Sequence, residues 1–456
     1  MLKHIVKYKG WLALVIALQF CCSVDTANAQ SDADKINELL TAYARQYKFN
    51  GTALVVSKGQ VVFSKGYGFK NAKDSTYNDV NSIFQIGSVT KQFTATIILQ
   101  LQEQKKLSVQ DKLSKYFPAF SWADSITIEN LLTHTSGIYN YTNNGKFMST
   151  EATKPASQEK IFALFKDKPL DFKPGSDFSY SNSGYMLLGY IIEKVTGQPY
   201  EQVVRDRIFK PLGMTHSGFD FAHLADPNRA TGYNVYTEKV KMPSVIVDSS
   251  ASFAAGAIYS TVNDLWEWHK GLMKNTVIKA ATQEKAYTPH KNNYGYGWFI
   301  DTIFGKRRIS HDGGIFGFVS TFVRIPADDA CIVLLANMGT GSLGDMSKGI
   351  LSILYNQPYD LPKEKKVITV DSTILQQYVG EYELTPGFSM VVRLKKGVLT
   401  VQASGQGELE MYAETPAKFF LKVVDAQIEF VKNAEGKVDR LILNQGGAEM
   451  PAKKVK

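Results

Sequence analysis

Apolar residues near the start of the chain follow two different periods. Helical spacing over about 34–48 predicts an amphipathic helix. Its apolar face would consist of Ile36, Leu39, Leu40 and Tyr43. The next two runs, 52–57 and 60–67, are rich in residues that favour strands and flank the turn sequence Lys58-Gly59. They predict a β-hairpin.

The middle of the chain has a different pattern. From about 105 to 200 the apolar spacing is mostly helical, and Gly and Pro residues end the helices at short intervals. Strand-like patterns then return in four runs, 294–301, 306–310, 318–325 and 330–337. We therefore predict an α/β fold, in which an antiparallel sheet built from both ends is flanked by helices and interrupted by a helical insertion. A cleft between sheet and insertion is the natural place for a site.

The pattern changes again after about residue 360. A polar, proline-marked stretch over 361–371 predicts a linker. Short alternating strands follow, in the runs 390–394, 398–401, 419–424, 428–431 and 441–443. They predict a separate small all-β barrel or sandwich over 372–456, behind a main domain over 30–360.

The first 29 residues have the three parts of a secretory signal peptide. A basic start precedes an apolar run over 11–20, and the small-x-small site Ala27-Asn28-Ala29 follows. The apolar run is too short to span a membrane, so we predict no transmembrane span in the mature chain. Cys21 and Cys22 suggest a lipid anchor, but bulky residues precede Cys21. We expect export, to the periplasm or outside the cell, with cleavage after Ala29.

Composition and charge limit the kinds of partner and cofactor that we expect. The formal charge of +9 falls by two when the leader is removed, and the basic residues are scattered, so we expect no nucleic acid partner. Only Cys331 remains in the mature chain, within an apolar run that predicts a buried strand and a structural thiol. The sequence has no clustered Cys/His ligands and no phosphate loop, so we predict neither a metal nor another cofactor.

Ser88-Val89-Thr90-Lys91 is the first candidate for chemistry. Ser is a favoured N-cap residue, and Lys91 follows one helical turn later, over the same face. A desolvated lysine can lose its proton near neutral pH and activate a serine. Ser157-Gln158-Glu159-Lys160 has the same pattern, so the motif alone does not identify a site.

Two further motifs could complete a serine hydrolase. In Tyr180-Ser181-Asn182, a phenol beside an ammonium could ionise and relay a proton, while the Asn182 amide could hold a substrate amide. Tyr141-Thr142-Asn143 matches this pattern as well. His311-Asp312-Gly313-Gly314 stands at a strand end, where glycines allow a substrate to approach the backbone. The sequences starting at His216 and His269 match His-x-Gly too.

The order of these motifs resembles that of the penicillin-recognising serine hydrolases, which include class C β-lactamases, D-Ala-D-Ala carboxypeptidases and related esterases. The resemblance covers roughly 36–355. It is carried by six blocks: Phe84 to Thr94, Leu131 to Gly137, Phe172 to Tyr185, Pro211 to Met214, Ala254 to Gly256, and His311 to Gly314. The main domain is thus similar to a β-lactamase-like serine hydrolase, and the C-terminal strands resemble an appended lipocalin-like barrel.

The resemblance implies a role for each motif. Ser88 would be the acylated nucleophile, with Lys91 and Tyr180 as the proton shuttle. Asn182, His311 and Gly313 would bind the substrate, which could be a small molecule, a peptide or peptidoglycan. The backbone N–H groups of Ser88 and Gly314 would form the oxyanion hole. We interpret His134, within the second block, as structural.

One departure from the family pattern bears on the substrate. β-Lactamases typically carry Lys where this chain has His311, and a histidine is only partly charged near neutral pH. This favours cleavage of D-amino-acid or cell-wall-type peptides, as by a D-Ala-D-Ala carboxypeptidase or D-aminopeptidase. A class C-like β-lactamase, a short-chain esterase and a non-catalytic penicillin- or wall-binding module are the alternatives.

Overall fold

The computed structural model describes residues 30–456 except 365, 386, 406, 423–425 and 446–447. The predicted signal peptide, with Cys21 and Cys22, lies outside the described residues. Among the described helices, none is both long enough and apolar enough to cross a membrane.

A six-stranded antiparallel sheet forms the centre of the first part of the chain. Its strand order is β2-β1-β12-β11-β10-β9. The strands are β1 (Gly51–Ser57), β2 (Gln60–Tyr67), β9 (Phe299–Ile303), β10 (Lys306–Ile315), β11 (Phe318–Ile325) and β12 (Ala330–Ala336). β1 pairs with β12, with Gly51 opposite Ala336. The early hairpin therefore joins the late strands in one sheet, which confirms the predicted antiparallel sheet.

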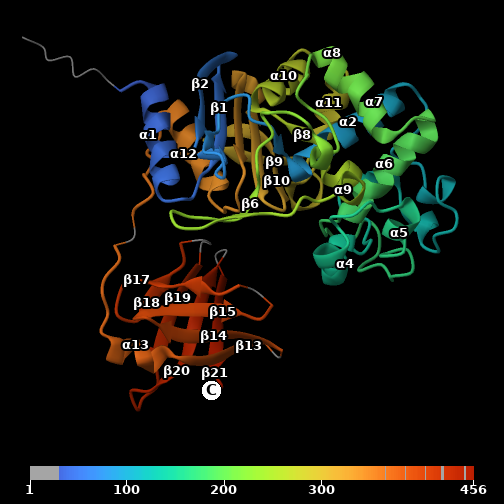
Figure 1. Ribbon diagram of the computed structural model, residues 1–456. Helices are drawn as coiled ribbons and strands as arrows, with labels where there is room; N and C mark the ends of the chain where they lie inside the picture. Colours follow the sequence, from blue (N-terminus) through green and yellow to red (C-terminus); the bar gives the residue numbers. More distant parts are fainter. Residues whose placement is uncertain (1–29, 365, 386, 406, 423–425, 446–447) are drawn as a thin grey trace, which may run out of the picture. The chain divides into compact units, whose positions relative to one another are not determined.

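Two helices cover one face of this sheet. They are α1 (Asp32–Arg45) and α12 (Leu343–Leu354), drawn in blue and orange in Figure 1. The predicted face of α1 is buried, and it packs with Ile350 and Leu351 of α12 and with alternate residues of the strands, such as Val323 and Leu334. Strands in the middle of the sheet are buried on both faces, so β12 is apolar throughout.

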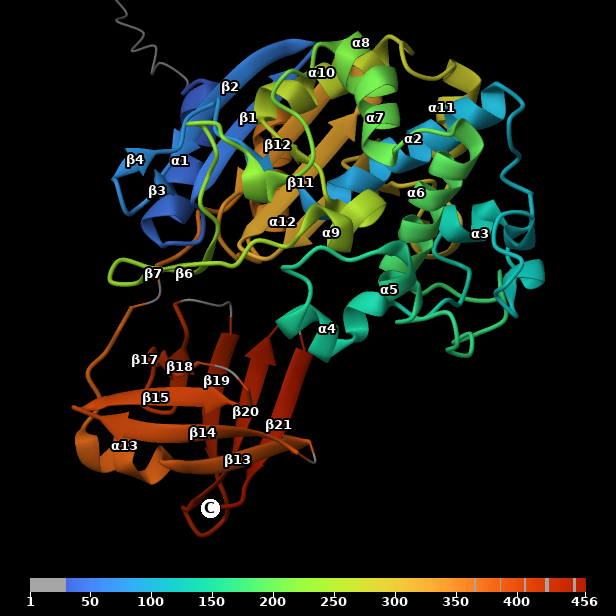
Figure 2. The same ribbon diagram turned by 45° about the vertical axis from the view of Figure 1, so that its right-hand side comes forward.

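The opposite face carries the larger core and most of the helices (Figure 2). The helices of this part are α2 (Thr90–Glu103), α3 (Ile128–Leu132), α4 (Gly145–Thr150), α5 (Gln158–Phe162), α6 (Asn182–Thr196), α7 (Tyr200–Val204), α8 (Lys210–Leu212), α9 (Ser249–Gly256), α10 (Val262–Met273) and α11 (Ala280–Ala286). Short pairs of strands join them: β3 (Phe69–Asn71) with β4 (Thr76–Tyr77), β5 (Phe84–Gln85) with β8 (Tyr259–Ser260), and β6 (Tyr233–Tyr236) with β7 (Lys241–Pro243). The predicted helical insertion is therefore present.

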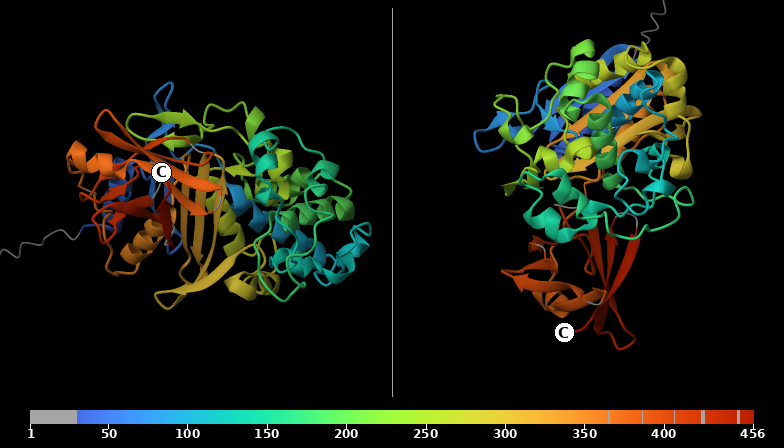
Figure 3. Two further views of the ribbon diagram at one scale, coloured as in Figure 1. Left: turned by 90° about the horizontal axis from the view of Figure 1, so that it is seen from below. Right: turned by 90° about the vertical axis from the view of Figure 1, so that its right-hand side faces the viewer.

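The C-terminal region is a nearly closed antiparallel barrel of nine strands (Figure 3). They are β13 (Gly380–Thr385), β14 (Phe388–Lys395), β15 (Val398–Ala403), β16 (Leu409–Glu410), β17 (Tyr412–Ala413), β18 (Lys418–Phe420), β19 (Ala426–Lys432), β20 (Val438–Gln445) and β21 (Ala448–Lys454). The short helix α13 (Ser372–Tyr378) precedes them. Tyr378 stacks on Phe430 with ring centroids 4.2 Å apart, so α13 shares the apolar core of the barrel.

Sequence pattern misjudged the strands that border the site. Residues 294–298 were expected to be strand, but β9 begins only at Phe299. β10 continues five residues beyond its expected end at Ser310 and includes the whole His311-Asp312-Gly313-Gly314 motif. Glycines weaken a strand pattern, which is why the motif did not read as strand.

Three histidines are buried in neutral form. The side chains of His134, His269 and His311 belong to residues that are 1%, 0% and 2% exposed. Burial lowers the pKa of His134 well below its usual value, that of His269 to about 4, and that of His311 to about 3. His269 also accepts a hydrogen bond at Nδ1 from Arg324 Nε (3.0 Å) and donates from Nε2 to Asp329 (2.8 Å).

We expect these histidines to make the protein acid-sensitive. Their pKa values are lower in the folded chain than in the unfolded chain, near 6.5, so the unfolded chain binds more protons below that pH and stability falls as pH falls. Each histidine that stays neutral should lower the free energy of unfolding by about 1.4 kcal/mol per pH unit below 6.5. Urea unfolding at pH 7, 6 and 5 measures this slope.

Single substitutions isolate one histidine from the carboxyl groups, because burial also raises the pKa values of Asp264 and Asp312, which act in the opposite sense. His269→Gln should reduce the slope by about 1.4 kcal/mol per pH unit, which corresponds to one proton. An unchanged slope in His269→Gln would mean that His269 is protonated in the folded protein.

Candidate active site

Ser88 stands in a tight turn directly before a helix. Residues Gly87–Val89 form a 3₁₀ turn, and α2 begins at Thr90. The Ser88 side chain caps no helix N–H, so the expected N-cap role is wrong, although its position at the helix start is as predicted. Lys91 lies in the first turn of α2, and its Nζ is 3.0 Å from Ser88 Oγ. One turn of chain thus brings the amine to the hydroxyl.

The Lys91 amine is fully buried among oxygen atoms. Besides Ser88 Oγ, its Nζ lies 2.8 Å from Asn182 Oδ1 and 2.8 Å from the Ala255 carbonyl oxygen. Burial lowers the pKa of Lys91 well below its usual value. A neutral amine donates two hydrogen bonds, here to Asn182 and Ala255, and its lone pair can then accept from Ser88. The geometry therefore suits an amine that takes the serine proton.

The Tyr180 hydroxyl lies in the same buried site. Its ring centroid is 4.8 Å from Lys91 Nζ. Burial raises the pKa of Tyr180, and the nearby Ser88 hydroxyl offsets this only in part. The expectation that this phenol ionises is therefore not supported: it is held protonated, and Lys91 is the stronger candidate for the base. Among the described residues the Tyr180 hydroxyl has no hydrogen-bond partner, which leaves its proton available to a substrate.

Asn182 is held by a neighbouring loop. Its backbone N–H donates to Asn140 Oδ1 (3.1 Å), and its side-chain Nδ2 donates to Thr142 Oγ1 (3.1 Å). These bonds fix the amide so that Oδ1 faces Lys91. Asn140 and Thr142 belong to the loop of the second Tyr-x-Asn match, whose Tyr141 hydroxyl donates to the Ala251 carbonyl (2.6 Å). That match is thus a support for the site, a role that its sequence did not indicate.

His311 is buried beside the site and both of its nitrogens are engaged. Nδ1 lies 2.6 Å from the Asp312 carbonyl oxygen and must donate to it, so Nε2 accepts from the Tyr294 hydroxyl at 2.9 Å. With a pKa of about 3, His311 is neutral at physiological pH. The expectation of a partly charged histidine there is wrong, because burial opposes protonation. Tyr294, its partner, was not identified from the sequence.

Glycines let β10 approach the Ser88 turn closely. A Cβ on Gly87, whose φ is +50°, would lie 2.8 Å from the Gly314 nitrogen. A Cβ on Gly313 would lie 2.0 Å from the Ile86 carbonyl oxygen, whereas one on Gly314 would have no atom within 4 Å. Gly313 therefore allows close packing, and Gly314 borders open space. The turn that carries Ser88 thus lies close to Gly314, and the oxyanion hole formed by these two N–H groups stays a prediction.

The competing motifs have structural roles. Ser157 Oγ caps α5 by accepting from the Lys160 backbone N–H, and Lys160 Nζ pairs with Glu151 at 2.9 Å near the surface. Within the described part of the chain, no three His, Cys, Asp or Glu residues are grouped so that they could hold a metal ion. Cys331 is buried in β12, as predicted, and burial raises the pKa of its thiol.

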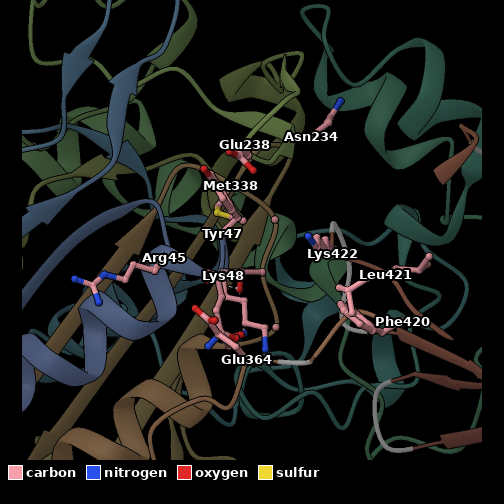
Figure 4. Close-up of a pocket in the computed structure, with 16 residues that line it drawn as sticks. Arg45, Tyr47, Lys48, Asn234, Glu238, Met338, Glu364, Phe420, Leu421 and Lys422 are labelled. Carbon is pink, nitrogen blue, oxygen red and sulfur yellow. Dashed lines mark hydrogen bonds between the residues drawn. The ribbon is translucent and has the colours of Figure 1, made fainter. Parts of the chain in front are cut away.

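A separate pocket of about 620 Å³ is drawn in Figure 4. Its lining includes Arg45 at the end of α1, Tyr47 and Lys48 just after this helix, and the 339–342 segment before α12. Neither Ser88 nor Lys91 is among the lining residues, so this pocket is not the site described above.

Comparisons with known proteins identify the family. The family model described as Beta-lactamase matches residues 36–353, and a domain of unknown function matches 364–454. Penicillin-binding protein 4* of Bacillus subtilis is 29% identical over 453 residues, which cover 94% of this chain and all of the relative. The putative penicillin-binding protein PbpX of Bacillus subtilis is 33% identical over 322 residues, which cover 70% of this chain and 78% of the relative.

Solved structures agree on the fold. D-amino acid amidase from Ochrobactrum anthropi superposes with a TM-score of 0.62 at 22% identity, over 71% of this chain and 99% of that chain. Because the family model spans more than half of the sequence, the assignment does not depend on any one relative. The chain belongs to the serine β-lactamase and penicillin-binding protein family.

Proposed function

We propose that this protein is an exported serine hydrolase that works through an acyl-enzyme on Ser88. The observation that carries the proposal is the environment of Lys91, a buried amine within 3.0 Å of the Ser88 hydroxyl and fixed by two other oxygens. A lysine that only stabilised the fold would contribute more to stability at the surface, since burying a charged amine costs free energy. Burial of Lys91 beside a serine is therefore best explained by catalysis.

In the proposed acylation step, Lys91 takes the Ser88 proton while Oγ attacks the substrate carbonyl. The negative charge that forms on the carbonyl oxygen is stabilised by the N–H groups of Ser88 and Gly314. Tyr180 donates its proton to the leaving nitrogen or oxygen, and Lys91 replaces that proton. Water then hydrolyses the ester on Ser88 by the same route in reverse. Asn182, whose Oδ1 faces Lys91, holds the amide of the substrate.

The state of His311 narrows the substrate. A carboxylate next to the scissile bond, as in D-Ala-D-Ala peptides and penicillins, needs a cation, and neutral His311 with both nitrogens engaged offers none. We therefore favour D-amino-acid amides and peptides cleaved from the amino end over carboxypeptidase or β-lactamase substrates. The shared fold of a D-amino acid amidase agrees with this choice. A short-chain esterase is the second candidate, since a small neutral ester also has no carboxylate that would need a cation in the site.

A substrate panel tests the proposal. We expect the purified protein to hydrolyse D-phenylalanine amide and p-nitrophenyl acetate at least about tenfold faster, in kcat/KM, than a D-Ala-D-Ala peptide or nitrocefin, since one lost charge pair costs at least about 1.4 kcal/mol. Ser88→Ala is the background control. Fast nitrocefin turnover would favour a β-lactamase, and stable labelling by penicillin without turnover of any substrate would favour a binding module.

A further inference from the structure

His134 contacts the Tyr180-Ser181-Asn182 motif in three ways. Its ring Nδ1 accepts a hydrogen bond from the Ser181 backbone N–H at 3.1 Å. Its carbonyl oxygen accepts from the Ser179 N–H at 3.0 Å. Its ring also packs on the Tyr180 ring, with centroids 4.1 Å apart. One residue thus holds the backbone on both sides of Tyr180 and the ring of Tyr180 itself.

The chemistry of the His134 ring is defined by this arrangement. Nδ1 accepts from a backbone N–H, so the ring proton is on Nε2, and the ring is neutral. Nε2 is buried and has no hydrogen-bond partner among the described residues. A buried N–H without a partner costs stability, and an apolar side chain of similar size would avoid that cost. The hydrogen-bond acceptor at Nδ1 is therefore the feature that distinguishes histidine from an apolar side chain at this position.

The end of helix α3 does not by itself explain why residue 134 is a histidine. His134 follows that helix with a left-handed φ of +56°, a conformation that Gly or Asn adopts more readily. A bulky ring there is strained by comparison. The strain is offset where the ring makes contacts that Gly cannot make. The ring also packs against Tyr185 and Tyr294, but its shortest ring contact is with Tyr180, and its only hydrogen bond among the described residues is with the Ser181 N–H.

We propose that His134 is a positioning residue, which sets the place of Tyr180 relative to Ser88 and Lys91 without touching the substrate. Ser181 directly follows Tyr180, so a hydrogen bond on the Ser181 N–H holds the backbone that carries the Tyr180 side chain. Loss of this bond would leave the Ser181 N–H unpaired in a buried site and let the segment move. This inference rests on the proposed function, in which Tyr180 transfers a proton.

Two substitutions of His134 test separately the hydrogen-bond acceptor at Nδ1 and the size of the aromatic ring. His134→Asn places an amide oxygen near the position of Nδ1 and tolerates the left-handed backbone. His134→Phe keeps an aromatic ring against Tyr180 but removes the acceptor. We expect kcat to fall by about 10²-fold in His134→Phe, with KM changed by less than about threefold, because a displaced catalytic group slows the chemical step. His134→Asn should recover at least about tenfold of that loss.

A matched control excludes general destabilisation. His269 is equally buried, its Nδ1 also accepts a hydrogen bond, and it lies outside the site. His269→Phe should lower the melting temperature but leave kcat of the folded protein within about threefold of wild type. Each variant is assayed below its own melting temperature, and the rate of Ser88 labelling by a fluorophosphonate gives a second readout.

The double variant tests whether His134 acts through Tyr180. Adding His134→Phe to Tyr180→Phe should slow the reaction by less than about threefold further, because the group to be positioned is already gone. Wild-type kcat in folded His134→Phe, or multiplied effects in the double variant, would overturn the inference. If wild-type Ser88 is not labelled at all, the proposed function itself fails, and the two failures are thereby distinguished.

Discussion

Replacing Ser88 by alanine will abolish hydrolysis of every substrate that the wild type cleaves. Without Oγ no acyl-enzyme can form, so we expect kcat to fall by at least roughly 10⁴-fold and covalent labelling by a fluorophosphonate to disappear. The fold should survive, because the Ser88 side chain caps no helix and fills no core position. Steady-state kinetics, intact-protein mass spectrometry after labelling, and a thermal melt measure the three parts of this prediction.

Ser157→Ala is the matched control, since Ser157 has the same Ser-x-x-Lys context. Ser157 caps α5, so its loss should cost about 1 kcal/mol of stability and leave activity unchanged. Labelling that persists in Ser88→Ala and is lost in Ser157→Ala would show that the wrong serine was chosen.

Sequence pattern alone was sufficient for the parts of the fold that depend on local periodicity. The hairpin β1–β2 and the buried strand β12 were predicted closely, because alternation and continuous apolar runs report burial directly. The predicted runs of the barrel correspond to β14, β15, β18, β19 and β20, whereas β13, β16, β17 and β21 were missed. β13 and β21 alternate, but they carry charged residues at several positions, including Glu381, Glu383 and Lys453, and few of the residues that favour strands.

The part of the site formed by Ser88 and Lys91 could also be predicted from local sequence. Ser88 and Lys91 are three residues apart on one turn, so spacing could predict their contact. Tyr294 could not be predicted in this way, because only the folding of residues 294–298 against β10 brings it to His311. The same holds for Asn140 and Thr142, which reach Asn182 across 40 residues of chain or more.

Protonation states were the least predictable feature. A histidine titrates near pH 6.5 and a tyrosine near 10 only when water solvates the charged form. The sequence identified His311 and Tyr180 but could not show that the His311 side chain and the Tyr180 hydroxyl are buried, which keeps both groups neutral. His311 therefore still disfavours carboxylate-bearing substrates, because it stays neutral in mildly acid solution. Acid should not improve the turnover of such substrates.

Removing the Tyr180 hydroxyl should have the second-largest effect on catalysis. Tyr180→Phe keeps the ring that packs against His134 and removes the group that transfers the proton to the leaving atom. We expect kcat to fall by roughly 10²–10⁴-fold. The loss should be largest for amides, whose nitrogen must be protonated to leave, and smaller for p-nitrophenyl esters, whose leaving group needs no proton. Stability should rise slightly or stay unchanged, because the buried hydroxyl has no partner among the described residues.

Tyr141→Phe is the control for this prediction, since Tyr141 is buried and belongs to the other Tyr-x-Asn match. Its hydroxyl donates to the Ala251 carbonyl, so its removal should cost about 1 kcal/mol of stability and change kcat by less than about threefold. The comparison of amide and ester substrates decides between a proton donor and a merely structural tyrosine, because a structural defect would slow both substrates alike. Equal losses on the two substrates, or a larger loss in Tyr141→Phe, would remove Tyr180 from the proton shuttle and leave Lys91 to carry the proton alone.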